Sequence, residues 1–296
     1  MRIVLIGCVQ FSESALKKLV SISANVVGVC TKQSSKFNSD HVDLSAICKK
    51  NDIPFIYAKN INDESVISWV QDLSPDVIYC FGWSSLLKKP ILDIPKYGSI
   101  GFHPAKLPHN RGRHPLIWAL VLGLKETATS FFFMDEKADT GKIIAQKVIA
   151  IDENDDATTL YQKVTAQALS QIEEFTYSLD KNNGEIEYQE QSIEEGNSWR
   201  KRSAADGVID FRMSAKAIVN LVRGLTKPYV GAHLVWNQNE IKVWAAEVYA
   251  CDESNLEPGK VLKSDLNAVI VKTYDSAVAI TDHGFNELPK QGEYIK

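Results

Sequence analysis

The sequence predicts an α/β protein: a doubly wound, mostly parallel sheet, followed by a smaller C-terminal domain that is β-rich and barrel-like. Over the first half of the chain, apolar runs of strand length alternate with segments whose apolar residues recur at helical spacing. This alternation is typical of strand–helix–strand units. In the last third, short apolar runs are separated by turns rich in Gly, Pro, Asn and Asp, which favours a small, partly open barrel.

Four apolar runs near the N-terminus are expected to be strands of the sheet: 2–6, 25–30, 54–57 and 76–81. Helical segments are expected between them. Ser12 can cap the first helix, which runs to Leu19, because a serine hydroxyl accepts an N–H of the first turn. Residues 43–50 and 63–73 are expected to form the next two helices, and the second of these has apolar side chains on one face.

Strands are then expected at 128–134 and 142–151, and a long helix at 158–179. Polarity rises from Asp180 to Arg202, so this stretch is expected to have little core of its own. The remainder is expected to contain a helix at 215–225 and strands at 232–236, 241–249, 259–263, 268–272 and 277–281. The expected domains are therefore residues 1–185, a linker at 186–202, and residues 203–296.

The composition is that of a globular protein, with 45% hydrophobic and 24% charged residues. The net charge of −4 gives no basic field that would attract nucleic acid or an anionic membrane. Five scattered cysteines without a C-x-x-C pair indicate reduced thiols in a cytoplasmic protein. The N-terminal MRIVLIG is expected to be a strand and not a signal peptide, and no apolar run is long enough to span a membrane.

A histidine and an aspartate that follow separate apolar runs are the candidate catalytic pair. His103 lies in a turn-rich loop after Ile100–Phe102, and Asp139 lies between two expected strands. Histidine can take a proton from an attacking nucleophile, and a neighbouring aspartate can orient its ring. Either residue alone is explained better as a structural loop residue. The hypothesis requires that both meet at the carboxyl ends of the strands, where open α/β sheets bind ligands.

Arg111 and Arg113 precede a helix expected at 116–122. Near that helix N-terminus they can bind a phosphate or carboxylate, or they form a solvated polar loop.

Two other kinds of site are not expected. The string GCVQFS after the first strand lacks the closely spaced glycines of an NAD site. His109 and His114 are separated by a proline-bounded loop, so no metal site is expected.

The whole chain resembles the folate-dependent formyltransferases, which include methionyl-tRNA formyltransferase and the sugar N-formyltransferases. The folate loop of the family looks like CFGWSSLLKKPIL, with Phe81 at its aromatic position. The signature His-Pro-x-x-Leu-Pro followed by Arg-Gly appears as HPAKLPHNRG, and the signature Asp-x-Gly appears as Asp139–Gly141. VRGLTKPYVGAH is similar to a stretch of the family's C-terminal domain. Several motifs in one order make the resemblance specific.

The resemblance implies the formyltransferase fold and the transfer of a formyl group from 10-formyltetrahydrofolate to a primary amine, without a metal. It implies that His103 deprotonates the amine and that Asp139 supports His103. The folate site that it implies is lined by Phe81, Gly82, Trp83, Leu86 and Asp139.

One position departs from the family pattern. The family usually has an asparagine two residues before the histidine, and this chain has Gly101 there. The tetrahedral intermediate of formyl transfer carries an oxyanion that needs a hydrogen-bond donor. Asn110 in the following loop, a backbone N–H or a water can replace the missing side chain. The candidate catalytic residues are therefore His103, Asp139 and Asn110.

Charge favours a small amine as the acceptor. After Thr31 the chain lacks the long basic insertion expected of the tRNA enzyme, and residues 200–296 hold 13 basic and 12 acidic residues. RSAADGVIDF also resembles a stretch of the sugar enzymes. The favoured acceptor is an amino sugar, carried on a nucleotide, with Arg111 and Arg113 as its candidate contacts. A methionyl-tRNA formyltransferase and a catalytically dead folate or nucleotide-sugar binding module remain alternatives, and a homodimer stays open.

Overall fold

The computed structural model describes residues 1–35, 38–192 and 194–295. The chain divides into two compact units. The first holds residues 1–115, 127–149 and 162–199, and the second holds 116–126, 150–161 and 200–296. The second unit thus combines the C-terminal segment expected from the sequence with two segments from the middle of the chain. The polar stretch up to Trp199 belongs to the first unit.

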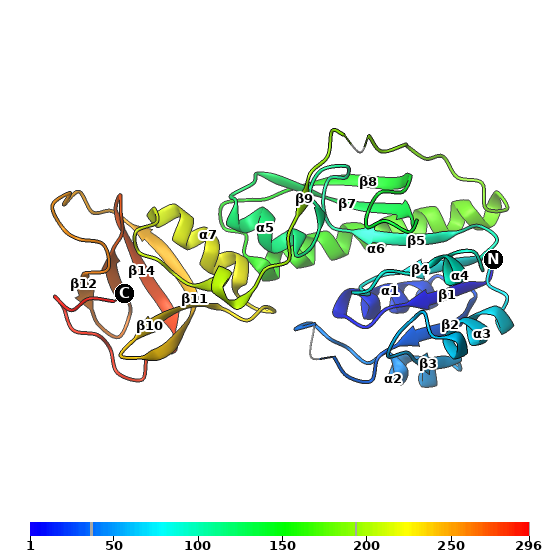
Figure 1. Cartoon of the computed structure of the whole chain (residues 1–296), viewed down its shortest axis with the longest axis horizontal. Coiled ribbons are helices and arrows are strands. Elements are labelled where there is room, and N and C mark those ends of the chain that lie inside the picture. The colour runs from blue at the N-terminus through cyan, green and yellow to red at the C-terminus, as the bar shows by residue number, and fades with distance from the viewer. Residues whose placement is uncertain (36–37, 193, 296) are drawn as a thin grey trace. The chain divides into compact units, whose positions relative to one another are not determined.

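Seven strands form the sheet of the first unit (Figure 1). They are β1 (Ile3–Ile6), β2 (Val26–Thr31), β3 (Phe55–Tyr57), β4 (Val77–Cys80), β5 (Ser99–His103), β7 (Glu126–Phe133) and β8 (Ile143–Ala150). Their order is β3-β2-β1-β4-β5-β7-β8. The pairs from β3 to β5 are parallel, and β7 runs antiparallel to β5. The direction of strand order reverses between β1 and β4, which confirms the predicted doubly wound fold class.

Helices cover both faces of this sheet, as the alternation of side chains in β4 shows. The helices of the first unit are α1 (Gln10–Ser21), α2 (Ser45–Lys50), α3 (Glu64–Asp72), α4 (Lys89–Leu92) and most of α6 (Ala157–Lys181). Nearly all of α5 (Pro115–Val121) belongs to the second unit. Ile78 and Cys80 pack with side chains of α3 and α4. Tyr79 points to the other face, where its hydroxyl lies 2.9 Å from that of Thr176 in α6.

Helix α1 begins three residues earlier than a cap at Ser12 predicts, and the role predicted for Ser12 is wrong. Val9 occupies the N-cap position, and the hydroxyl of Ser12 accepts the N–H of Val9 at 3.2 Å. The same hydroxyl donates to the carbonyl oxygen of Phe81 at 2.5 Å. Ser12 therefore joins α1 to the chain just after β4.

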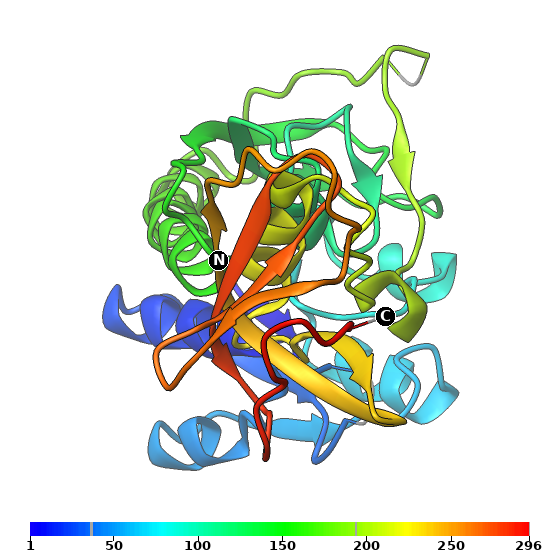
Figure 2. The same ribbon diagram turned by 90° about the vertical axis from the view of Figure 1, so that its left-hand side faces the viewer.

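The second unit has its own sheet of five strands: β10 (Ala232–Trp236), β11 (Asn239–Tyr249), β12 (Val261–Ser264), β13 (Val269–Lys272) and β14 (Ala277–His283). Their order is β10-β11-β14-β13-β12, and every pair is antiparallel. Helix α7 (Ala215–Leu225) packs against this sheet (Figure 2) and shares its apolar core. A β-rich C-terminal domain is therefore confirmed. Among the described residues its hydrogen bonding gives an open sheet, with β10 and β12 at the edges.

The expected linker has few buried side chains, but it is hydrogen-bonded to the first unit. Its β9 (Ser198–Trp199) pairs in parallel with β6 (Arg111–Gly112). Gln189 pairs with Ile143 through two backbone hydrogen bonds of 2.8 Å. Within the described part of the chain, no helix is both long enough and apolar enough to cross a membrane.

Candidate active site

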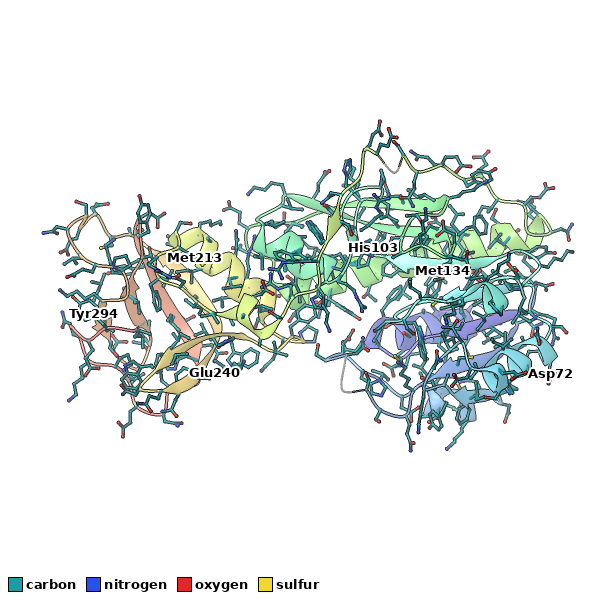
Figure 3. The ribbon with its side chains drawn as sticks, viewed as in Figure 1. Asp72, His103, Met134, Met213, Glu240 and Tyr294 are labelled. Atoms are coloured by element: carbon teal, nitrogen blue, oxygen red, sulfur yellow. The ribbon has the colours of Figure 1, made fainter. Side chains whose placement is uncertain are left out.

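The carboxyl ends of the parallel strands β1, β4 and β5 meet at one edge of the first unit's sheet. The strand order reverses between β1 and β4, and ligands of open α/β sheets bind outside such a reversal. The loop that begins with Phe81 follows β4 directly, and His103, labelled in Figure 3, is the last residue of β5. This edge therefore carries most of the residues that the sequence singles out.

A backbone carbonyl fixes the ring orientation and the neutral tautomer of His103. The residue is 5% exposed, and its Nε2 lies 2.8 Å from the carbonyl oxygen of Asn110. A carbonyl oxygen only accepts, so Nε2 carries the proton of the neutral ring and Nδ1 has the lone pair. Nδ1 faces Oδ2 of Asp139 at 3.6 Å. A proton taken up at Nδ1 would therefore face a carboxylate, which stabilises the charged ring.

Asp139 reaches His103 by a route that differs from the expected one. The sequence suggests that both residues follow strands to the same edge. Because β7 is antiparallel to β5, however, Phe133 at the end of β7 lies beside Ile100 and not beside His103. The loop between β7 and β8 must return along β5 before Asp139 meets His103. The N–H of Gly112 then fixes the carboxylate by donating to Oδ2 at 3.0 Å.

The backbone of Asn110 contacts His103, and its side chain is left available. Its carbonyl binds His103, and its N–H donates to Oδ1 of Asn197 at 2.7 Å. Its backbone has φ +63°, a left-handed conformation that Asn tolerates better than most residues. Among the described residues, no hydrogen bond holds the Asn110 side-chain amide, so that amide can donate to a ligand.

The position of the missing family asparagine is occupied by neighbouring side chains. A Cβ on Gly101 would lie 2.9 Å from Cζ of Phe132 and 3.0 Å from Cγ of Met134. Both contacts are closer than a Cβ normally makes. A larger residue at 101 therefore requires both Phe132 and Met134 to move, and the glycine matches the packing around it.

The four side chains of the expected folate loop have different surroundings. Phe81 is fully buried among Phe11, Tyr79 and Phe131, so the structure corrects its expected role as a lining side chain. Trp83 is half-buried, with the ammonium of Lys32 4.3 Å from its ring centre, and Leu86 is 54% exposed. Gly82 has φ +74°, and a Cβ there would lie 2.2 Å from Val9, so the turn requires glycine.

The two arginines expected to contact substrate are placed differently. Arg111 is 9% exposed, and its Nη2 lies 2.9 Å from where a Cβ on Gly196 would be. Arg113 is half-buried, and its Nη1 donates to the carbonyl oxygen of Ser84 in the loop after β4 at 3.1 Å. Arg113 is therefore the better placed of the two to contact a ligand at this edge.

A cysteine at the same edge is not suited to nucleophilic chemistry. Cys8 follows β1, is fully buried, and its Sγ lies 3.6 Å from the carbonyl oxygen of Gly82. Burial raises the pKa of the Cys8 thiol to about 11, so the thiol stays protonated near neutral pH. Within the described residues, no three His, Cys, Asp or Glu side chains gather where they could hold a metal ion.

Family models match both parts of the chain. A formyl transferase domain matches residues 1–174, and a formyl transferase C-terminal domain matches residues 201–289. The chain belongs to the formyl transferase family. Its enzyme class, N-formyltransferase, follows from this membership.

Three similar proteins show how this formyl transferase relates to others. The bifunctional polymyxin resistance protein ArnA of Wigglesworthia glossinidia brevipalpis is 31% identical over 97% of the chain, which spans only 43% of that protein's length. A methionyl-tRNA formyltransferase of Caldanaerobacter subterraneus subsp. tengcongensis is 30% identical, and the match covers 95% of this chain and 91% of the length of that protein. The crystal structure of WlaRD, a sugar 3N-formyl transferase, in the presence of dTDP and 5-N-formyl-THF has a TM-score of 0.69 at 18% identity, covering 97% of this chain and 98% of that one.

Two residues at the site of this formyl transferase are not indicated by any sequence pattern. Asn197 accepts the N–H of Asn110, and Nε2 of Gln191 donates to the carbonyl oxygens of Asp139 at 3.1 Å and Gly141 at 2.5 Å. Both lie in the polar segment expected to be a linker. Their partners are backbone groups far away in the sequence, and a single sequence carries no signal for such contacts.

Proposed function

We propose that this formyl transferase uses 10-formyltetrahydrofolate to formylate the primary amine of an amino sugar carried on a nucleotide. The observation that carries the catalytic part is the pair formed by Nδ1 of His103 and the carboxylate of Asp139, 3.6 Å apart. When bound, the donor supplies the formyl carbon, which exchanges its bond to N10 for a bond to the amine nitrogen.

His103 moves the proton that this exchange requires. Its Nδ1 takes a proton from the attacking amine, while the Asn110 carbonyl keeps Nε2 protonated and the ring in place. Asp139 stabilises the imidazolium, and His103 returns the proton to N10 as the bond to N10 breaks. The side-chain amide of Asn110 is the candidate donor to the formyl oxygen as negative charge develops there. No net proton is gained or lost.

The loop after β4 has groups that fit the donor. Among the described residues, no acceptor binds the backbone N–H groups from Trp83 to Leu87, so these donors can bind the polar edge of a pterin. The half-buried ring of Trp83 and the exposed Leu86 supply apolar surface beside them. Ligand sites commonly combine such apolar surface with a few polar backbone groups. Phe81 contributes through its position in the core beneath the loop.

Binding of a stable donor analogue is expected to quench the fluorescence of Trp83. Titration with 5-formyltetrahydrofolate should give saturable quenching in the micromolar range, because the ligand would contact the indole. The matched control is Trp83→Phe, which should lose most of the quenching signal while keeping the other five tryptophans. Quenching of equal size in Trp83→Phe, or no binding in the micromolar range, would contradict a donor site at this loop.

Charge supports a small acceptor more than a tRNA. The segment 200–296 has nearly equal numbers of basic and acidic residues, and several of its basic residues are paired. Affinity for nucleic acid grows with the number of phosphates that Lys and Arg neutralise. The shared fold with a sugar 3N-formyl transferase studied with dTDP is compatible with the same acceptor class.

The RSAADGVIDF stretch supports an amino-sugar acceptor less than expected. Its charged residues have structural roles in the second unit. The Arg202 guanidinium lies 4.6 Å from the ring centre of Trp118, and its Nη2 donates to the carbonyl oxygen of Asp206 at 2.5 Å. The Asp206 carboxylate accepts from Arg200 and from the N–H of Ser203. These contacts explain the motif without a substrate.

A methionyl-tRNA formyltransferase remains the second candidate, because relatives of that name are 30% identical over nearly the whole chain. Mass spectrometry after incubation with 10-formyltetrahydrofolate separates the candidates. The acceptors should be a panel of dTDP- and UDP-linked amino sugars and initiator methionyl-tRNA. We expect one formyl group to be added to at least one nucleotide-linked amino sugar. Formylation of the tRNA alone would replace the proposed acceptor, and turnover of none would favour the binding module.

A further inference from the structure

We propose that the segment formed by residues 189–192 and 194–199, here called the strap, sets the geometry of the catalytic pair, with Gln191 and Asn197 as positioning residues. The inference rests on the formyl transfer proposed above and adds to it two residues outside the family motifs. The ring of His103 is held by the segment around Asn110, and Asp139 lies on the loop between β7 and β8. The strap is hydrogen-bonded to both of these segments.

Asn197 fixes the loop that holds the ring of His103. Its Oδ1 accepts the N–H of Asn110 at 2.7 Å, and its backbone carbonyl accepts the N–H of Arg111 at 3.1 Å. These bonds hold Asn110 in its left-handed conformation, with its carbonyl directed at Nε2 of His103. A non-glycine residue in this region of backbone space costs free energy and persists only where its surroundings impose it. Asn197 therefore helps to decide which nitrogen of His103 carries the proton.

Gln191 fixes the loop that carries the carboxylate. Its Nε2 donates to the carbonyl oxygens of Asp139 and Gly141, which bracket the turn of the Asp-x-Gly signature. Asp139 also has a left-handed backbone, with φ +60°. One side-chain amide thus holds the two ends of the turn that presents the carboxylate to Nδ1 of His103.

The backbone of the strap at Gly196 packs closely against the segment that leads from His103 to Asn110. A Cβ on Gly196 would lie 2.2 Å from the carbonyl oxygen of Pro108. The parallel pairing of β9 with β6 adds backbone hydrogen bonds on the other side of Asn197. Misplacement of a catalytic group by about 1 Å can reduce a rate by roughly 100-fold. The loss of contacts that hold both loops on one segment is therefore expected to lower kcat measurably.

Isosteric variants separate positioning from simple packing. Gln191→Glu keeps the size of the side chain but places an acceptor against two carbonyl oxygens. Asn197→Ala removes the acceptor of the Asn110 N–H, and Asn197→Asp restores one. Ser192→Ala is the matched control, because Ser192 is exposed beside Gln191 and makes no hydrogen bond to a described residue.

Turnover is measured with 10-formyltetrahydrofolate and the amine that the panel identifies. We expect Gln191→Glu and Asn197→Ala to lower kcat roughly 10- to 100-fold with little change in KM. Asn197→Asp should recover much of the loss, and Ser192→Ala should match the unmodified enzyme. A structural role alone would lower the melting temperature without this split between kcat and KM.

The protonation of the His103 ring gives a readout that needs no turnover. In protein labelled with ¹⁵N-histidine, the neutral ring of His103 should carry its proton on Nε2, with the signal assigned by its loss in His103→Gln. Asn197→Ala should shift these ring signals toward a mixture of tautomers, and Ser192→Ala should leave them in place. If Gln191→Glu and Asn197→Ala keep both the kcat and the ring signals of the unmodified enzyme, the strap is only a covering segment. If no amine is formylated, the function proposed above fails, and the ring signals alone decide whether the strap positions His103.

Discussion

Replacing His103 with glutamine is expected to lower kcat by about 100- to 10,000-fold, the usual contribution of a general base. Glutamine keeps an N–H that can donate to the Asn110 carbonyl, but it has no basic lone pair where Nδ1 stands. The loop should therefore keep its shape while the proton acceptor is lost. Release of tetrahydrofolate in the presence of the acceptor amine measures kcat, and thermal unfolding checks the fold.

Asp139→Asn is the partner variant of this test. It keeps the size of the side chain and an oxygen for the N–H of Gly112, but it removes the charge that faces Nδ1. Because the two residues act as a unit, the double variant should lose little more activity than His103→Gln alone. Affinity for 5-formyltetrahydrofolate should change little in His103→Gln. A rate near that of the unmodified enzyme in His103→Gln would show that another group takes the proton.

The alternation of apolar runs was sufficient to predict the fold class of the first unit. Strands such as β2 are continuous apolar runs, because helices cover both faces of the sheet. The long helix α6 has apolar residues at helical spacing, because one of its faces packs on a core. The helix expected at 158–179 is observed as Ala157–Lys181. In contrast, β6 and β9 have two residues each, which is too short for any periodic signal.

The sequence singled out candidate residues for the site but did not indicate how the chain brings them together. His103 and Asp139 could be singled out from motif order, whereas the direction of β7 could not, since an antiparallel apolar strand reads like a parallel one. The loop after β7 therefore has to run back along β5 before it reaches Asp139, and no sequence pattern predicts this path. Phe81 shows the same limit, because an aromatic residue at a strand end suits either a ligand slot or a core.

The side-chain amides that organise the site were missed for a related reason. Gln191 and Asn197 are bound to backbone groups of other loops, 52 and 87 residues away in sequence. Polar residues in a segment without apolar periodicity resemble a solvated linker. Their contacts depend on tertiary structure alone, so only coordinates reveal them.

Removal of the Asn110 side chain is expected to lower kcat by about 100- to 1,000-fold if its amide donates to the developing oxyanion. Asn110→Gly is the better variant, because glycine adopts φ +63° at no steric cost and leaves the bonds to His103 and Asn197 intact. Alanine at this position would add backbone strain to the loss of the amide. The affinity for 5-formyltetrahydrofolate should barely change, since the hydrogen bond strengthens only in the transition state.

Two companion variants decide whether the amide itself is responsible. Asn110→Asp keeps the size and tolerates the same backbone conformation, but it has no donor, so it should be at least as slow as Asn110→Gly. Restoring the family asparagine at Gly101 requires space, because a Cβ there would lie 2.9 Å from Phe132 and 3.0 Å from Met134, and these two side chains belong to one packed cluster. Gly101→Asn combined with Met134→Ala should therefore recover part of the activity of Asn110→Gly, whereas Gly101→Asn alone should recover less. If Asn110→Gly turns over at the rate of the unmodified enzyme, the oxyanion takes its hydrogen bond from a backbone N–H or a water, and Asn110 serves the reaction only through its carbonyl.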